Sequence, residues 1–269
     1  MGDIGAVAPL SKTPNRQHQP DRIDTGPRYL PTDAVRLNNM FRGRDTLEML
    51  GALFADDMIG DAAIVSSFGA ESAVLLHLIG GIQPNIPVLF LETGKHFPET
   101  LDYRDQLVAH IGLTNLQNIM PDVAALAAKD ENGLRWSYDP DGCCEIRKVQ
   151  PLKAALAGYD AQFSGRKAFQ AATRSNLPRF EVESGRLKIN PIIDWDEARI
   201  AAYVADHGLP AHPLVGQGYP SIGCAPCTSR VLPGEDPRSG RWKGWEKVEC
   251  GIHTPVTDPA ADSANDPIF

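Results

Sequence analysis

The sequence predicts an α/β fold with a doubly wound, mostly parallel sheet, and three observations lead to this prediction. Short apolar runs of the kind buried in parallel sheets alternate with segments whose apolar residues recur every three or four positions. Polar segments follow the first two apolar runs directly, as at the carboxyl edge of an open sheet. A chain of 269 residues with 42% hydrophobic content is long enough for one large domain or two small ones.

The amino-terminal part is expected to hold a leader and a helical region ahead of the sheet. Residues 1–32 contain prolines and scattered charges, so we expect a poorly ordered leader. Residues 33–58 carry apolar side chains at helical intervals, and Gly43 is a point at which this segment can divide into two helices.

The remaining elements are expected to alternate as far as residue 213. The expected strands cover residues 62–66, 87–91, 116–120 and 161–164, with residues 186–193 as a further candidate. The expected helices cover residues 72–79, 122–129 and 195–207, and another begins after Pro98. Together these elements would form one nucleotide-binding domain over residues 33–213 that includes the first cysteine pair.

Regular patterning fades after Pro213, where Gly and Pro become dense. We expect residues 214–269 to form a flexible C-terminal segment that carries the second cysteine pair and Cys250, with a mobile tail from Thr254.

Charge and hydropathy exclude several classes of protein. The net charge of −8 argues against general nucleic-acid binding, although local basic groups such as Arg147-Lys148 and residues 238–243 can still bind a small anion. The sequence has no apolar run of roughly 18 residues for a membrane-spanning helix, and the first 30 residues lack the apolar core of a signal peptide. An odd number of cysteines, five, disfavours a secreted disulfide framework, so a cytoplasmic protein is expected.

The loop after the first expected strand is the strongest candidate for an anion site. It reads Ser66, Ser67, Phe68, Gly69, Ala70, Glu71 and Ser72 and leads into a helix. Small residues let backbone N–H groups approach a phosphate, and the helix dipole favours the negative charge. An ordinary strand-to-helix turn with a serine cap has the same composition. The loop lacks the Gly-Lys-Ser ending of a Walker loop, so a nucleotide would be bound mainly by backbone amides.

The second expected strand also ends in polar residues. Glu92, Thr93 and Gly94 follow it, and they are expected beside the first loop at the ligand-binding edge of the sheet. His96 lies in the same segment, and we interpret it as a capping or solvent-facing residue because a lone histidine in a turn usually has that role.

The five cysteines divide into four candidate metal ligands and one candidate nucleophile. Cys224 and Cys227 have the spacing found in zinc knuckles and iron–sulfur sites. Cys143 and Cys144 are adjacent, and neighbouring thiolates reach separate irons of a cluster more readily than one zinc ion. The pair follows an Asp-Pro-Asp-Gly turn, which is expected to start a helix. The spacing favours an iron–sulfur cluster, with zinc as the main alternative. The unpaired Cys250 is a candidate nucleophile.

Taken together, these motifs resemble the assimilatory adenylylsulfate (APS) and phosphoadenylylsulfate (PAPS) reductases. The resemblance covers about residues 35–253 and rests on motifs in the family's order. They are Cys143-Cys144-x-x-Arg147-Lys148, Cys224-x-x-Cys227-Thr228, Glu249-Cys250-Gly251-Ile252-His253, the loop from Ser66 to Glu71, and the segment from Glu92 to Thr100. The resemblance implies an adenine nucleotide α-hydrolase-like fold with a modified PP-loop at residues 66–72. Members with both cysteine pairs bind a 4Fe-4S cluster and use APS.

The resemblance also implies roles for individual residues. Cys250 would be the catalytic nucleophile, and Cys143, Cys144, Cys224 and Cys227 would hold the 4Fe-4S cluster. The implied substrate-binding residues are the loop Ser66–Ser72, Glu92, Thr93, Gly94, Lys148, Gly165, Lys167, Arg174, Arg238, Arg241 and His253. The sequence departs from the family pattern after Gly165, where Lys167 replaces an expected arginine and a second arginine is absent.

The resemblance further implies thioredoxin-dependent reduction of APS to sulfite and AMP. Cys250 would attack the sulfur of APS, release AMP and carry the sulfonate until an external thiol resolves it. No other cysteine remains free if four bind the cluster, so the reductant is external, and a homo-oligomer is also expected. PAPS reduction is the nearest alternative. A PP-loop ATP pyrophosphatase that thiolates tRNA, or a non-catalytic zinc module, is more remote, because neither explains this loop, the acidic chain and Cys250 together.

Overall fold

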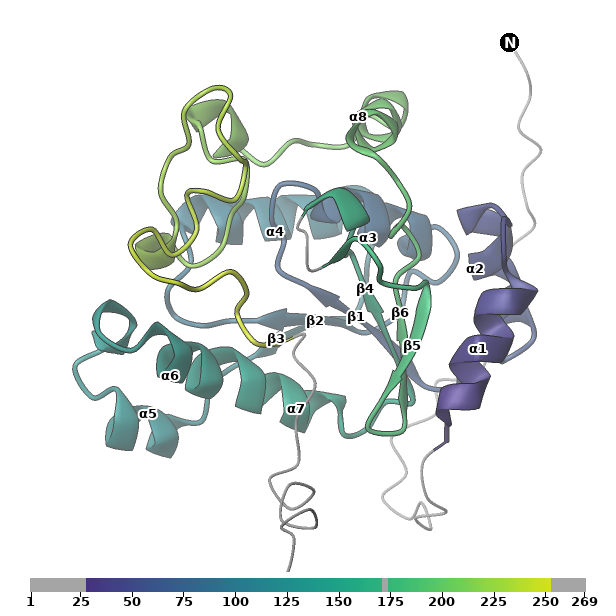
Figure 1. Cartoon of the computed structure of the whole chain (residues 1–269), viewed down its shortest axis with the longest axis horizontal. Helices are drawn as coiled ribbons and strands as arrows, with labels where there is room; N and C mark the ends of the chain where they lie inside the picture. The colour runs from purple at the N-terminus through teal and green to yellow at the C-terminus, as the bar shows by residue number, and fades with distance from the viewer. Residues whose placement is uncertain (1–27, 171–173, 253–269) are drawn as a thin grey trace, which may run out of the picture.

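The computed structural model describes residues 28–170 and 174–252, and these form a single mixed sheet with helices on both faces (Figure 1). The strand order is β3-β2-β1-β4-β6-β5, and only β5 runs antiparallel to its neighbour. The strands are β1 Ala62–Ser66, β2 Val88–Leu91, β3 Leu116–Ile119, β4 Ala161–Ser164, β5 Phe180–Glu183 and β6 Arg186–Ile189.

The helices cover the sheet from two sides, as expected for a doubly wound fold. In Figure 1 α3, α4 and α8 lie over one face, α5, α6 and α7 over the other, and α1 and α2 beside β5. The α-helices are α1 Pro31–Met40, α2 Thr46–Ala55, α3 Ser72–Gly80, α4 Pro98–Ile111, α5 Val123–Lys129, α6 Pro140–Cys144, α7 Gln150–Leu156 and α8 Glu197–Asp206. Shorter helical turns are η1 Arg135–Ser137, η2 Glu145–Val149, η3 Ala168–Gln170, η5 Val215–Gln217 and η6 Ala225–Cys227.

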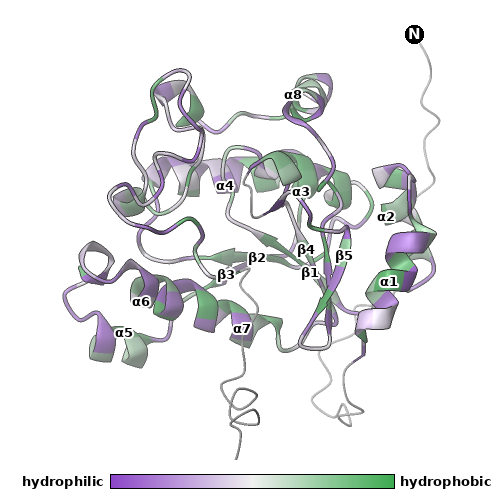
Figure 2. Cartoon of the chain, viewed as in Figure 1, coloured by the Kyte–Doolittle hydropathy of each residue, from purple (hydrophilic) through white to green (hydrophobic). Residues whose placement is uncertain are grey.

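Apolar side chains hold the layers together on both faces of the sheet. All four residues of β2 are buried, as a strand covered on both faces requires. Figure 2 shows β2 and α3 as hydrophobic, while β5 at the edge of the sheet is partly hydrophilic. The main core joins the sheet to α1 through α4 and to α8, and a smaller core joins it to α7.

The expected strands and helices of the sheet are confirmed with small shifts, but β5 was missed. β5 forms a hairpin with β6 through Ser184 and Gly185, both of which have positive φ. Phe180 is buried and the three residues after it are half-buried, and four residues were too few to give a distinct pattern. The strand expected to reach residue 193 ends at Ile189, and Pro191, two residues later, has no N–H to extend the ladder.

The expected division of residues 33–58 at Gly43 is confirmed. α1 ends before Gly43, which has a φ of +70°, and Asp45 begins α2 by accepting a hydrogen bond from the N–H of Leu47 at 2.8 Å.

The expected leader extended too far towards the first helix. Residues 28–32 belong to the fold, because Tyr29 is buried and its hydroxyl donates to the carbonyl of Met58. Residues 1–27 and 253–269, including the expected substrate contact His253, lie outside the described residues. No helix among the described residues combines the length and apolar character needed to cross a membrane.

Candidate active site

The order of the strands brings the expected loops together at one edge of the sheet. β2 and β4 flank β1, and the chain moves outward in opposite directions from these central strands. Loops at the carboxyl ends of strands beside such a reversal enclose a crevice, which is where doubly wound sheets bind ligands. The loops after β1, β2 and β4 therefore share the place at which a nucleotide is expected.

The loop after β1 has backbone groups available but uses two of its side chains internally. The N–H of Phe68 donates to Ser66 Oγ at 3.2 Å, and the ring of Phe68 is fully buried against Phe90. Phe68 has a φ of +49°, an uncommon value that turns the backbone at this point. The Phe68 ring and N–H are thus both used within the protein, whereas Ser67 is exposed beside it.

The loops after β1 and β4 are joined by an ion pair. Lys167 Nζ lies 2.9 Å from a carboxylate oxygen of Glu71, and Gln170 also donates to that carboxylate. Burial lowers the pKa of Lys167 even though Glu71 acts in the opposite direction. The positive charge of Lys167 is therefore already paired within the protein.

The arginines expected to bind the substrate anion converge beside the C-terminal cysteine. Arg174 donates through Nε and Nη2 to one oxygen of the Glu249 carboxylate, at 3.0 and 2.7 Å. Arg238 reaches the other carboxylate oxygen at 3.3 Å and donates to the carbonyl of Val248 at 2.6 Å. Both guanidinium groups thus contact Glu249, the residue that directly precedes Cys250 in the chain.

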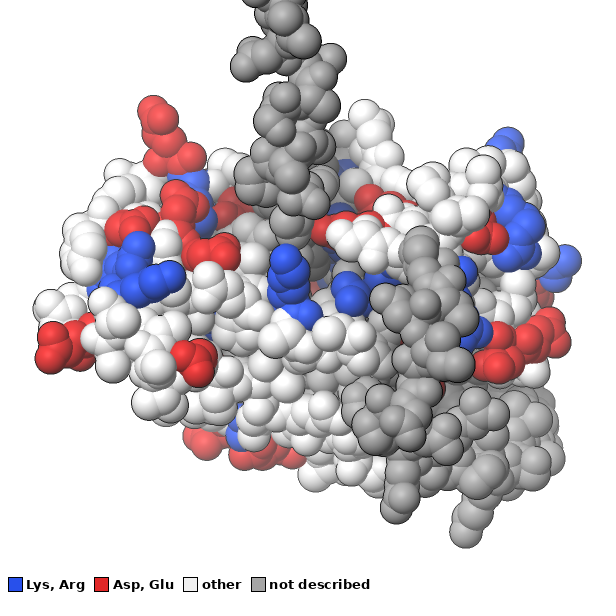
Figure 3. Space-filling model, turned by 90° about the horizontal axis from the view of Figure 1, so that it is seen from below, with Lys and Arg blue, Asp and Glu red and all other residues white. Residues whose placement is uncertain are grey.

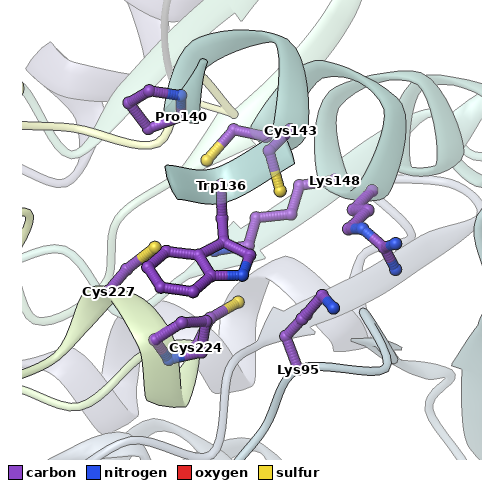
Figure 4. A pocket seen from close by; sticks show the side chains of 10 residues that line it. Lys95, Trp136, Pro140, Cys143, Lys148, Cys224 and Cys227 are labelled. Carbon is purple, nitrogen blue, oxygen red and sulfur yellow. The ribbon is translucent and has the colours of Figure 1, made fainter. Parts of the chain in front are cut away.

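Both cysteine pairs line one small pocket between α6 and η6 (Figure 4). In Figure 4, Cys143 from α6 faces Cys224 and Cys227 from the C-terminal segment, with Trp136 and Lys148 beside them. The residues that line the pocket are Lys95, Trp136, Pro140, Cys143, Cys144, Arg147, Lys148, Cys224, Pro226 and Cys227. The structure thus brings together cysteines that lie about 80 positions apart in the sequence.

The helical segment that carries the first pair starts and bends for identifiable reasons. Asp139 accepts a hydrogen bond from the N–H of Gly142 at 2.8 Å, and Pro140 occupies the first turn, where its missing N–H costs nothing. A π-turn over Glu145–Val149 follows. Pro151 comes directly after it, and the wider turn gives its ring room near the preceding carbonyls.

The segment after β2 turns towards the cysteine pocket. The hydroxyl of Thr93 is hydrogen-bonded to the thiol of Cys224 at 3.3 Å, and the backbone carbonyl of Thr93 accepts a hydrogen bond from Arg147 at 2.7 Å. Arg147 is buried and pairs with Asp130 at 2.6 Å. Thr93 therefore contacts the second cysteine pair, a contact that the sequence did not predict.

The other two residues of this segment stabilise its turn. A carboxylate oxygen of Glu92 accepts from the N–H of Gly94 at 2.9 Å, and Gly94 has a φ of +69°, which favours glycine. The ring of His96 lies with Nε2 2.8 Å from the carbonyl of Leu91, and burial lowers its pKa. His96 thus ties the turn to the end of β2, which fits the expected capping role and not the solvent-facing alternative.

The buried charges make the thiols of the pocket unequal. Burial raises the pKa of Cys143 and of Cys144 to about 11 in each case. Burial acts in the same direction on Cys224, but the charge of Lys148 and the hydrogen bond from Thr93 outweigh it and lower its pKa. Burial tends to lower the pKa of Lys148, and the thiols of Cys224, Cys250 and Cys144 reverse that effect and raise it. Lys148 lines the pocket and interacts electrostatically with Cys250 as well as with the pocket thiols.

Arg241 is a second buried cation near these thiols. Its guanidinium lies over the ring of Trp242 at 4.4 Å, and Nε has no hydrogen-bond partner among the described residues. Burial lowers the pKa of Arg241, and the neighbouring charge of Arg238 acts in the same direction, against the thiols of Cys250, Cys224 and Cys227. A buried guanidinium with an unused donor is suited to bind an anion.

The pocket is lined by side chains of the kind that bind soft metals. Four thiols and no carboxylate line it, which is the ligand choice of iron–sulfur clusters and of structural zinc. Within residues 28–170 and 174–252, however, no three His, Cys, Asp or Glu side chains are arranged around a position for a single metal ion. Thiols that bind separate irons of a cluster do not need to meet at one point.

Acidic and basic side chains are mixed on the face shown in Figure 3. Lys and Arg lie in small groups near Asp and Glu, without a continuous basic surface over the part of this face that is described.

Comparisons with known proteins identify relatives of the chain. Residues 61–230 match the model of the phosphoadenosine phosphosulfate reductase domain. The chain is 55% identical to an adenosine 5'-phosphosulfate reductase of Mesorhizobium japonicum over 233 residues, which cover 87% of this chain and 92% of the relative.

Solved structures give the same relationship at the level of the fold. A phosphoadenylyl-sulfate reductase of Candida auris, crystallised as a phosphate complex, superposes with a TM-score of 0.62 at 28% identity, covering 76% of this chain and 98% of that one. An FMN adenylyltransferase of Candida glabrata superposes with a TM-score of 0.50 at 12% identity, covering 87% and 90%, which shows a shared fold alone.

Proposed function

The chain belongs to the phosphoadenosine phosphosulfate reductase domain family, and from this premise we propose that it reduces adenylylsulfate to sulfite and AMP. It is an oxidoreductase that acts on a sulfur group. The single observation that carries the choice of site is the convergence of Arg174, Arg238 and Arg241 with Lys148 beside Cys250, at the edge of the sheet where nucleotides bind.

The proposed substrate position follows from the available donors. The backbone amides of residues 66–72 would bind the nucleotide phosphate at the start of α3. The guanidinium groups would bind the sulfate oxygens, each through two parallel hydrogen bonds. Such donors stabilise the charge that moves onto the bridging oxygen as the sulfur is transferred.

The reaction would take place in two steps. In the first, the Cys250 thiolate forms an S–S bond to the sulfur of the sulfate, and the bond between that sulfur and the phosphate oxygen breaks with release of AMP. In the second, a thiolate of a reductant attacks Cys250 Sγ and displaces sulfite, which leaves a mixed disulfide. A second thiol of the reductant then releases Cys250, so two thiols become one disulfide.

We propose thioredoxin as the reductant. The second step needs a dithiol, and the other four described cysteines line the pocket. Cys250 is part-exposed near the end of the described chain, which leaves it accessible to a protein partner. Five free thiols suit a reducing compartment, so we place the reaction in the cytoplasm. We further expect a homo-oligomer that binds neither nucleic acid nor membrane.

The four thiols of the pocket are proposed to hold a 4Fe-4S cluster. Support comes from the count and chemistry of the ligands and from Lys148 and Arg147 beside them, which would stabilise thiolates. A bound cluster would supply a fixed negative charge beside Lys148 and a rigid connection between α6 and the C-terminal segment. Anaerobically purified protein should be brown and contain about four irons and four sulfides, whereas a colourless protein with stoichiometric zinc would contradict the assignment.

The nearest alternative is reduction of PAPS, which carries an additional phosphate on the ribose. The segment after Gly165 that departs from the family pattern holds Lys167, and this lysine is paired with Glu71. A paired lysine offers less charge to an additional phosphate, which favours APS. A sulfite-release assay with both nucleotides decides between them, and a higher kcat/KM for PAPS would reverse the proposal.

The role of Cys250 can be tested directly. Wild-type protein mixed with APS and no thioredoxin should gain roughly 80 Da, the mass of one SO3 group, on the peptide that contains Cys250. Cys250→Ser should retain iron and bind AMP but form no sulfite, because a serine hydroxyl is a far weaker nucleophile than a thiolate. An adduct on Cys224 or Cys227, or turnover by the serine variant, would overturn the assignment.

A further inference from the structure

The carboxylate of Glu249 lies between the two guanidinium groups that we assign to the substrate anion. Arg174 donates twice to one oxygen, at 3.0 and 2.7 Å, and Arg238 lies 3.3 Å from the other. All three side chains are mostly buried, with exposed fractions of 11%, 21% and 22% for Arg174, Arg238 and Glu249. Exclusion of water strengthens these charge-assisted hydrogen bonds relative to surface pairs.

A sulfate group and a carboxylate present similar oxygen acceptors to a guanidinium. Arginine binds either through parallel N–H donors, so one set of donors cannot fully satisfy both anions at once. The segment that carries Glu249 also contains a second glutamate, Glu246, which serves as a control. Glu246 is exposed and forms no ion pair with the described residues, although it lies only three positions from Glu249.

We propose that Glu249 is a positioning residue that competes with the substrate anion for Arg174 and Arg238, so that anion binding releases the segment that carries Cys250. This inference rests on the proposed function and extends it. Before substrate binds, the carboxylate holds Cys250 beside the cations. When the anion takes over the guanidinium groups, Glu249 loses both of its ion pairs and Cys250 becomes free to approach the sulfur and then the reductant, while Lys247 keeps its ion pair with Asp141.

The other side of Cys250 is held in a different way. Ile252 packs against the smaller core formed by the sheet and α7, an apolar contact that an anion does not disturb. Gly251, between Cys250 and Ile252, has a φ of +86°, a conformation that glycine adopts without strain. The release would therefore act on one side of Cys250 only, with Ile252 as a fixed point.

A chain of hydrogen bonds connects Glu249 to the nucleotide loop. Arg174 Nη1 donates to the side-chain oxygen of Gln170 at 2.8 Å, and Gln170 donates in turn to Glu71. Glu71 belongs to the loop expected to bind the nucleotide phosphate. A nucleotide that moves this loop would thus act on Arg174 as well, and AMP and sulfate together should release the segment more effectively than either ligand alone.

The first experiment compares full-length Glu249→Gln with Glu246→Gln and the wild type. Glutamine keeps the size of the side chain and removes its charge. Loss of the competitor should tighten the binding of sulfate, measured in the presence of AMP at constant ionic strength, by roughly tenfold. Glu246→Gln removes the same charge without touching the arginines and should bind as the wild type does. Glu249→Asp keeps the charge on a shorter side chain, and its affinity for sulfate should lie between those of the wild type and Glu249→Gln.

The second experiment measures how fast iodoacetamide alkylates Cys250, with the modified peptide identified by mass spectrometry. In the wild type, AMP with sulfate should accelerate the reaction, and sodium chloride of equal ionic strength should not. Glu249→Gln should react fast without ligand and respond little to it. In steady state it should show a lower KM for APS at a similar kcat, because the anion meets less competition and the segment is released in both substrate complexes.

The outcomes separate this inference from the proposed function. If the wild type reduces APS but Glu249→Gln keeps wild-type affinity and alkylation rates, the competition is wrong and the function stands. If the sulfate and alkylation results hold but the wild type releases no sulfite from APS or PAPS, the competition stands and the function is wrong. Slower alkylation of the wild type in AMP and sulfate would also overturn the release.

Discussion

Gly223 sets the position of the buried guanidinium of Arg241. A Cβ at residue 223 would overlap the Nη2 and Cζ atoms of Arg241, so a glycine is needed for the guanidinium to lie where it does. That position places Arg241 near Cys250 and the thiols of the pocket. The position of the Arg241 guanidinium thus depends on Gly223, a residue without a functional group.

We predict that Gly223→Ala lowers kcat/KM for APS by roughly tenfold, because a displaced guanidinium no longer meets the anion in the right geometry. The thermal midpoint should change little, since the substituted position is outside the main core. Steady-state kinetics and a thermal melt check this. Gly216→Ala is the matched control, because a Cβ there meets nothing within 4 Å. Equal kinetics for the two variants would contradict the role given to Gly223.

Among the larger elements, α4 is held to the C-terminal half of the chain by a buried histidine. His212 is 1% exposed, its Nε2 lies 3.1 Å from Thr100 Oγ1, and its Nδ1 accepts from the N–H of Leu214 at 3.2 Å. Its ring also packs against Tyr103. Because Nδ1 accepts a hydrogen bond, the ring is neutral, and burial lowers the pKa of His212 to about 4 although Glu99 acts in the opposite direction.

We predict that this histidine makes folding stability depend on pH between about 4 and 6.5. The folded pKa lies below the ordinary value of 6.5, so the unfolded chain binds the proton more tightly. The stabilisation is complete above pH 6.5 and is lost as the pH falls towards 4, by up to about 3 kcal/mol. Denaturant unfolding across this range measures it.

His212→Gln should flatten this pH dependence, because glutamine does not titrate. His110→Gln is the control, since His110 lies exposed near the end of α4, and the variant should keep the wild-type slope. If both variants and the wild type lose stability equally on acidification, another group is responsible.

At the scale of the whole molecule, the sequence was sufficient for the sheet because each strand is a local pattern. The apolar runs that became β1 and β2 are continuous and bounded by polar residues, so they could be recognised without knowledge of their neighbours, and β3 and β4 followed from the alternation of strands with helices. β5 could not, because its short alternation has meaning only beside β6 and α1, where the side chain of Asn38 bonds to both backbone groups of Phe180.

The candidate site was predictable in part for a similar reason. The cysteine spacings pointed to one shared pocket, and the structure brings both pairs to it. The pairing of Asp130 with Arg147, and of Glu249 with Arg174, joins segments far apart in the chain and leaves no local pattern. Such contacts depend on how the loops pack, and spacing in a single sequence does not contain that information.

The C-terminal segment has little regular structure to hold it in place. Its described residues 214–252 form only the short turns η5 and η6 and one isolated bridge, between Thr228 and Arg241. One of its backbone connections to the sheet is the hydrogen bond from the N–H of Ala225 to the carbonyl of Lys95 at 2.7 Å. A metal group bound by both cysteine pairs would therefore be a main connection between this segment and α6.

We predict that removing iron from the protein loosens residues 214–252 and leaves the α/β domain folded. A ligand that binds only the folded arrangement stabilises it by mass action. Loss of the metal group should therefore destabilise the chain where the two cysteine pairs meet. Hydrogen exchange followed by mass spectrometry should show faster exchange in η6 and around Trp242 after chelation, with β1, β2 and β4 unchanged because their core does not include the pocket. Cys143→Ser should reproduce the loosening, and Cys250→Ser, which removes a thiol outside the pocket, should not. Uniform exchange changes across the sheet and the segment would show instead that the metal group stabilises the whole chain as one unit.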